Sequence, residues 1–256
     1  MCPDPKWAVD LGKYKPDKEN TYAYPIEEEG WIQAHNSLRG QIHTFGEALG
    51  ATVARSEGKP PLAWEIAAIR RWWKSHHDVI HCHHHNEDER YVPFLNERFN
   101  YPHKLETDHV TLVKVLEELA SLVDGLSTED AEGLDKLAKA WDEYGTMLKP
   151  HLLEEEAFVL PLMRAYFTHE EMGKLVEVIL TDPEAPPEEI GAFIHFMGEE
   201  KFRSVFMKQE GIPCFVWWVG GFSSKLTLYR TEIVPQVDAL KSGTPPPPPA
   251  STCSIL

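Results

Sequence analysis

Hydrophobic residues recur every three to four positions in several segments of the chain, the spacing that places them on one face of an α-helix. Two of these segments each contain a single histidine, His35 in WIQAHNSLRGQI and His109 in ETDHVTLVKVLEEL. A further histidine follows each of them, His83 and His151, far enough along to leave room for a turn and most of another helix. The pattern predicts two similar helical hairpins, which pack as an all-α, up-down four-helix bundle.

One constellation occurs twice: a histidine, a glutamate four residues later, and a proline six residues after the glutamate. The two copies are His83, Glu87 and Pro93, and His151, Glu155 and Pro161. Residues four apart share a helical face, so each pair can direct an imidazole and a carboxylate to one point. With the histidines of the preceding helices, the set is four imidazoles and two carboxylates. It suits two transition-metal ions, whereas calcium or magnesium would need more oxygen ligands.

The prolines of these segments affect the expected helix ends. A proline removes a backbone donor and clashes with the carbonyl four residues earlier. We therefore expect Pro93 and Pro161 to kink or end their helices just past the site. For Pro150 two alternatives stand, a bend in the fourth helix or a position just before its start.

The stretches HNSLR, HHHNEDERYVPFL, DHVTL and HLLEEEAFVLPLM resemble the hemerythrin-like (HHE, cation-binding) family, over residues 31–168. The resemblance implies a four-helix bundle around a non-haem di-iron centre, with two iron ions as cofactors and zinc or manganese as alternatives. The implied ligands are His35, His83, Glu87, His109, His151 and Glu155, with the glutamates bridging. Val113 stands where the family's oxygen carriers have a further ligand, so the chain is similar to the wider family, which senses or handles iron, oxygen, nitric oxide or peroxide.

Three functions are compatible with such a site. The first is a module that binds or senses a small diatomic ligand or iron. The second is an oxidoreductase acting on oxygen or peroxide, and the third is a membrane-anchored adaptor whose metal only stabilises the bundle. We favour the first, because the sequence contains no recognisable organic-substrate pocket, nucleotide loop or nucleophile constellation.

Histidines are also crowded just before Glu87, in HHDVIHCHHHNEDER. Three of them share one helical stripe: His77, His81 and His84. We interpret this stripe as a solvated face that binds nickel or copper without selection, with a second, surface metal site as the alternative. His85 points to a third face and should be exposed, and Cys82 is expected to pack rather than to ligate.

Composition limits the partners. The net charge of −16 argues against nucleic acid binding, which depends on patches of Lys and Arg. The most apolar run, residues 212–222, is too short to cross a membrane and is expected to be buried or interfacial. The four cysteines have no paired spacing, so we expect neither a disulfide framework nor a zinc knuckle, and a cytoplasmic, reducing compartment fits.

Four regions follow from these patterns: an irregular arm (1–30), the bundle (31–168), a helical extension (169–240) and a proline-rich spacer (241–256). In the extension, Thr168 and Glu171 predict a capping box, and Gly220 with Gly221 predicts a turn. Its aromatic residues are expected to pack on the bundle: Phe193, Phe196, Phe202, Phe206, Trp217 and Trp218.

The last four residues, Cys253-Ser254-Ile255-Leu256, form a C-a-a-X pattern behind five consecutive prolines. The final leucine predicts a geranylgeranyl group on Cys253. The expected location is therefore a cytosolic membrane face, reached through this lipid anchor. No basic stretch precedes the motif, so the attachment is expected to be reversible.

Overall fold

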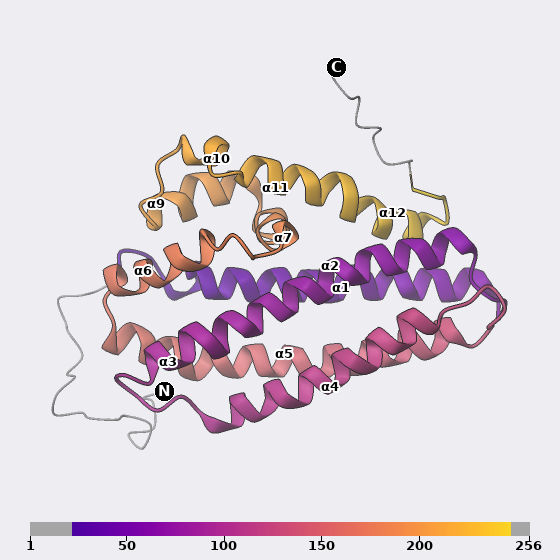
Figure 1. The fold of residues 1–256 in the computed structure, drawn as a ribbon, viewed down its shortest axis with the longest axis horizontal. Helices are drawn as coiled ribbons and strands as arrows, with labels where there is room; N and C mark the ends of the chain where they lie inside the picture. Colours follow the sequence, from indigo (N-terminus) through magenta and orange to yellow (C-terminus); the bar gives the residue numbers. More distant parts are fainter. Residues whose placement is uncertain (1–21, 247–256) are drawn as a thin grey trace.

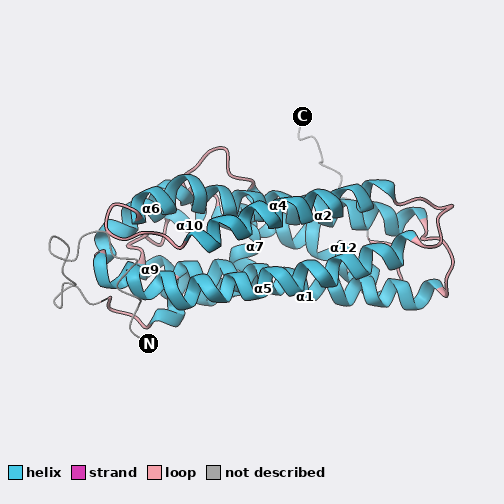
Figure 2. Ribbon diagram, turned by 90° about the horizontal axis from the view of Figure 1, so that it is seen from below, coloured by secondary structure: helices cyan, strands magenta, loops and turns pink. Residues whose placement is uncertain are grey.

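The computed structural model describes residues 22–246, which contain helices and no strand (Figure 1). Four long helices run side by side along the molecule (Figure 2). They are α1 (Gly30–Ser56), α2 (Ala63–Asn86), α4 (His103–Gly125) and α5 (Gly133–Tyr166). α1 packs against α5, α5 against α4, and α4 against α2. The predicted all-α bundle is confirmed.

Each long helix buries one apolar face, and the site histidines lie on that face. On α4 the buried residues follow the helical repeat: Leu105, His109, Leu112, Leu116, Leu119 and Val123. Because His109 occupies one of these positions, packing of the leucines carries its imidazole into the bundle.

α2 does not end at the proline. It continues through a π-helical turn, η3 (Glu87–Tyr91), into α3 (Val92–Leu95), so Pro93 lies inside a continuous helical path. A second π-turn, η5 (Tyr229–Ile233), likewise ends two residues before a proline, Pro235. The wider π-turn relieves the clash that a proline ring makes with the preceding turn.

α5 runs through both of its prolines, Pro150 and Pro161, to Tyr166. The alternative that Pro150 precedes a helix start is therefore wrong. Of the expected kink or end, an end at Pro161 is wrong as well, whereas the helical path through Pro93 does end shortly after it, at Leu95. Packing of α5 against both α1 and α4 holds the chain helical across Pro150 and Pro161, since tertiary contacts outweigh the local cost of a proline.

The extension covers one side of the bundle (Figure 1). Its elements are α6 (His169–Leu180), α7 (Pro187–Met197), α8 (Glu199–Lys201), η4 (Phe202–Phe206), α9 (Met207–Gln209), α10 (Val216–Val219), α11 (Phe222–Leu228), η5 and α12 (Val234–Ser242). α7 and α12 each contact both α1 and α2. Gly40 permits the close approach of α7, because a Cβ there would lie 2.3 Å from the Phe196 ring.

The extension contains the predicted capping box and the predicted glycine turn. The capping box of Thr168 and Glu171 is confirmed, and Gly221, at φ 77°, forms the turn before α11. Five of the six aromatic residues are buried or half-buried, but Trp218 is 66% exposed, so its predicted packing is wrong. The neighbouring Trp217 takes the inward face of the four-residue α10, which turns Trp218 outward.

No described helix is both long enough and apolar enough to cross a membrane. Cys253 and the rest of the predicted prenylation motif lie outside the described residues.

His76 is a buried histidine of the bundle core. Its ring stacks on Trp72, its Nδ1 lies 3.0 Å from Gln41 Oε1, and its Nε2 lies 3.1 Å from the Tyr144 hydroxyl. An imidazole that donates through Nδ1 and accepts from the tyrosine satisfies both contacts while neutral. Burial lowers the pKa of His76 from its ordinary value to about 3.

The depressed pKa of His76 predicts acid sensitivity. In the unfolded chain this histidine takes up a proton near pH 6.5, whereas in the folded chain it stays neutral to about pH 3. Its contribution to stability is therefore complete above pH 6.5 and is lost as the pH falls towards 3. Between pH 7 and pH 5 the loss is about 2 kcal/mol. In urea unfolding, His76→Gln should reduce the wild-type pH dependence by that amount, and His85→Gln, at an exposed position, should not.

Candidate metal centre

The predicted ligands gather in one polar layer between two apolar clusters of the bundle. Each ligand-bearing helix shows the same order, with an apolar residue of one cluster before the ligand and one of the other cluster after it. Examples are Trp31, His35 and Leu38 on α1, and Leu105, His109 and Leu112 on α4. His35 and Glu155 are fully buried. Charged groups in such a layer need partners of opposite charge.

One group of candidate ligands comes from α1 and the end of α2. The ligand atoms of His35, His83 and Glu87 lie within 4.8 Å of one another. Glu87 Oε1 is 3.2 Å from His83 Nε2 and 3.6 Å from His35 Nε2. Glu87 stands at the first residue of the π-turn, so the widened backbone begins at this carboxylate.

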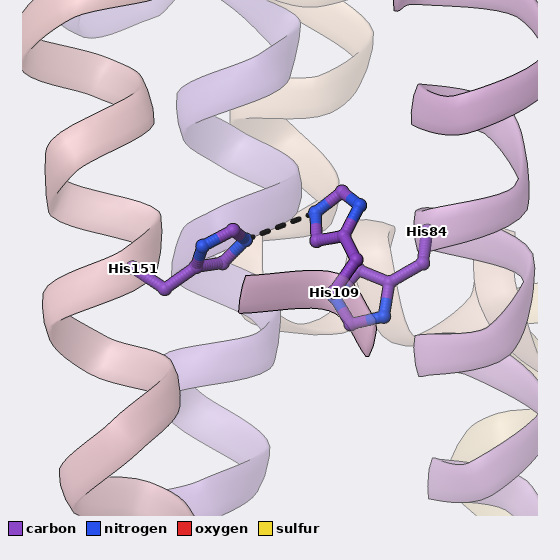
Figure 3. Close-up of side chains that lie close together, drawn as sticks. All are labelled: His84, His109 and His151. Atoms are coloured by element: carbon purple, nitrogen blue, oxygen red, sulfur yellow. Dashed lines mark hydrogen bonds between the residues drawn. The ribbon is translucent and has the colours of Figure 1, made fainter. Parts of the chain in front are cut away.

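A second group is made only of histidines, from α2, α4 and α5 (Figure 3). The ligand atoms of His84, His109 and His151 also lie within 4.8 Å of one another. His109 Nε2 is 3.0 Å from His151 Nε2, a contact that two nitrogens make when they converge on one point. The His84 ring stacks beside that of His109, with ring centres 4.5 Å apart.

The two glutamates lie between these groups, and each turns one oxygen to either side. Glu87 Oε1 faces His35 and His83, and its Oε2 is 3.5 Å from His109 Nε2. Glu155 Oε2 is 3.5 Å from His35 Nε2, and its Oε1 is 3.4 Å from His151 Nε2. Carboxylates arranged in this way can bridge two cations.

Two further carboxylates lie at hydrogen-bond distance from the Nδ1 atoms of His35 and His109. His35 Nδ1 is 2.9 Å from Glu156 Oε1, and His109 Nδ1 is 2.8 Å from Asp88 Oδ1. An Nδ1–H that donates to a carboxylate leaves Nε2 free to accept a metal ion, and it fixes the orientation of the ring. Asp88 and Glu156 each follow a bridging-type glutamate directly in sequence, and this adjacency is the signal that could have identified them.

These contacts raise the pKa of two histidines. Burial alone would lower the pKa of His35, but hydrogen bonding to Glu156 and the charge of nearby carboxylates raise it to about 9. For His109, burial is likewise opposed by Asp88 and Glu155, and the pKa rises to about 10. The layer therefore draws positive charge, which a divalent cation can supply in place of the two protons.

The pKa values of Glu87, His83 and His84 are also shifted in the direction that favours a bound cation. Burial and the charge of Glu155 raise the pKa of Glu87 to about 7, because two adjacent carboxylates resist ionising together. Burial and the neighbouring histidines hold the pKa values of His83 and His84 well below the ordinary range. Both imidazoles are therefore neutral, the form that binds metal.

Several of these atoms are buried without a hydrogen bond among the described residues. They are His83 Nε2, His84 Nε2, Glu87 Oε1, Glu87 Oε2 and Glu155 Oε2. Buried polar atoms without partners are rare and costly, and a pair of cations among them would remove that cost. The donor set of imidazoles and carboxylates fits iron, zinc or manganese.

Two aromatic residues contact the layer from its apolar side. The Tyr101 hydroxyl donates to Glu155 Oε1 at 2.8 Å, which fixes one carboxylate. The Trp31 indole N–H donates to His35 Nε2 at 2.7 Å, so a metal ion at that nitrogen would replace this hydrogen bond.

Sequence reasoning missed His84. We interpreted His77, His81 and His84 as a solvated stripe, but His84 is buried, so this interpretation is wrong for that residue. His77 and His81 remain at the surface, with ring centres 4.7 Å apart, and His85 is exposed as expected. α4 packs over the last turn of α2 and covers His84, a contact that the pattern of α2 alone does not contain.

Residues 100–199 match the family model of the hemerythrin HHE cation-binding domain. The match covers α4, α5, α6 and α7, and it includes His109, His151 and Glu155. No curated protein and no solved structure matches the chain. The helical bundle and its buried histidine and carboxylate clusters agree with this match. Residues 100–199 are therefore similar to the hemerythrin HHE cation-binding domain.

Proposed function

We propose that this protein binds two iron ions and uses them to bind or sense oxygen, nitric oxide or iron itself. The observation that carries the proposal is the orientation of Glu87 and Glu155, each of which directs one oxygen to either histidine group. Two ions with the glutamate carboxylates between them would explain this arrangement. A single ion would leave one of the two histidine groups without a metal to bind.

The proposed ligand sets are unequal. His35 and His83 would hold one ion, and His84, His109 and His151 the other, with both glutamates shared. Iron at these positions would supply redox chemistry and affinity for small diatomic ligands. Asp88 and Glu156 keep the rings of His109 and His35 in place, and Tyr101 keeps the Glu155 carboxylate from rotating.

A second candidate function, an oxidoreductase acting on oxygen or peroxide, is favoured by one observation. A cavity reaches His83 and Glu87 from the side of the extension, so a reactant could approach the ligands there. Sensing and turnover differ in what is measured. A sensor changes its spectrum or fold with the ligand, whereas an enzyme consumes oxygen or peroxide at a steady rate.

Elemental analysis of the full chain, expressed with ample iron, tests the metal pair. We expect about two irons per chain, with near-ultraviolet absorption that responds to oxygen. Glu87→Ala and Glu155→Ala should each lower the iron content, because each removes oxygens shared by both ions. Glu89→Ala, at an exposed position two residues from Glu87, should retain the full content.

Other results would contradict the iron proposal. Stoichiometric zinc in colourless, redox-silent protein that unfolds on chelation would instead support the adaptor whose metal stabilises the bundle. A steady oxygen or peroxide consumption that both glutamate substitutions abolish would favour the oxidoreductase, and a rate that survives both would reject it.

Comparing the metal content of two variants, His84→Ala and His85→Ala, tests whether His84 is a ligand. His84→Ala should reduce the metal content from about two ions to about one per chain, because it removes an imidazole from the all-histidine group. His85→Ala alters an exposed ring one residue away and should leave the content unchanged. Equal metal content in wild type and His84→Ala would remove His84 from the ligand set.

We also propose that a geranylgeranyl group on Cys253 tethers the protein to a cytosolic membrane face. The C-a-a-X ending and the proline spacer before it support this proposal. Mass spectrometry of protein from its native cells should find Cys253 prenylated and the last three residues removed. Cys253→Ser should abolish membrane partition and Cys214→Ser, at an exposed free cysteine, should not. An intact, unmodified terminus would dispose of the anchor.

A further inference from the structure

A cavity of about 120 Å³ lies between the bundle and the extension. Its walls come from α1, α2, η3 and α5 on one side and from α6, α7 and η4 on the other. His83 and Glu87 line it, whereas His84, His109 and His151 do not. The cavity therefore reaches the side of the metal centre that has fewer imidazoles.

The walls of this cavity are mainly apolar, with Val79 from α2 opposite Val176, Ile190 and Phe193 from the extension. A cavity of roughly 150 Å³ with such walls is large enough for benzene. The cavity is of similar size, so it suits a molecule with about the bulk of one ring or a short chain.

The lining contains carboxyl groups but no lysine or arginine. The four carboxyl groups that line the cavity are Glu29, Glu87, Glu189 and Glu210. Glu29 is bonded by Arg164 at 2.6 Å, and Glu210 lies 3.7 Å from His169 Nε2. Glu87 belongs to the metal centre, which leaves Glu189.

Glu189, on α7, receives hydrogen bonds from two neutral donors. They are the Cys82 thiol at 3.1 Å and the Asn86 amide nitrogen at 3.4 Å. Asn86 Oδ1, also at the cavity wall, is buried without a hydrogen bond among the described residues. Burial raises the pKa of the Glu189 carboxyl, because removal from water disfavours its charged form.

We infer that this cavity binds a small primary amine in its protonated form, with the ammonium group at Glu189 and Asn86 and the apolar body between α2 and α6. An ammonium group carries three donors, enough for both a carboxylate and the unpaired amide oxygen. Its charge strengthens the bond to Glu189. The amine lies beside His83 and Glu87, so it is the substrate or effector class of the metal centre, a role that rests on the proposed function.

A surface groove adjoins the cavity on the extension side. The groove is larger and shares four lining residues with the cavity: His169, Val176, Leu180 and Glu210. The groove and the cavity therefore adjoin at these residues, and we place the entry of the amine there, past α6.

Titration calorimetry of the zinc-loaded full chain at pH 7 tests the inference with three probes of similar shape: benzylamine, benzyl alcohol and benzoate. Benzylamine should bind about 10- to 100-fold more tightly than benzyl alcohol, the ratio expected for hydrogen bonds to a charged group. Benzoate should bind most weakly, because the lining is acidic. Equal affinities for benzylamine and benzyl alcohol would overturn the inference.

Two pairs of variants locate the site. Glu189→Gln should reduce benzylamine binding to the level of benzyl alcohol, whereas Glu188→Gln, the same charge change one residue away and outside the lining, should not. Val176→Phe should block all three probes, and Val178→Phe, on the exposed side of α6, should block none. If Val176→Phe does not fold, the Glu189 pair and the probe series decide. Benzylamine binding that survives Glu189→Gln would overturn the inference.

Metal content measured on the same samples separates this inference from the proposed function. If the protein retains metal but does not bind benzylamine, only the amine site is contradicted. If the protein binds benzylamine through Glu189 but retains no metal, the amine site is supported and the proposed metal pair is contradicted.

Discussion

Two carboxylates, Glu87 and Glu155, are buried side by side in the core, and the rest of the bundle is arranged around the cost of placing them there. In a region of low polarity, neighbouring negative charges repel strongly, and removing them from water is costly. Imidazoles surround the pair, outer carboxylates orient those imidazoles, and apolar clusters above and below exclude water. Cations between the histidine groups and the carboxylates would balance this charge in place of the protons on His35 and His109.

The repeated motif predicted this layer well because its information is local. A histidine and a glutamate four residues apart must share a helical face, so His83 with Glu87 and His151 with Glu155 could be paired from sequence alone. His35 and His109 followed from the helical repeat of their own segments. His84 could not be found in this way. On α2 it shares a stripe with surface histidines, and only the packing of α4 decides that it is buried.

The prolines show the same limit in the backbone. Their local effect, a missing donor and a steric clash, predicted that the helices kink or end just past the site, yet α5 continues through Pro150 and Pro161 to Tyr166. At Pro93 the chain relieves the clash by a π-turn that begins at Glu87. A π-turn inserts one residue into the helical repeat and so changes the direction of the side chains that follow. Asp88 lies against His109 in this turn, just as Glu156 lies against His35 on the regular helix α5.

The extension determines what surrounds the metal centre on its less protected side. Its helices come from residues after the repeated motif, and α7 reaches both α1 and α2 because Gly40 leaves space for Phe196. That docking brings Glu189 to Asn86, the residue before Glu87, and it makes one wall of the cavity. The motif residues thus define which ions the bundle can hold, while residues far from the motif define what can approach them.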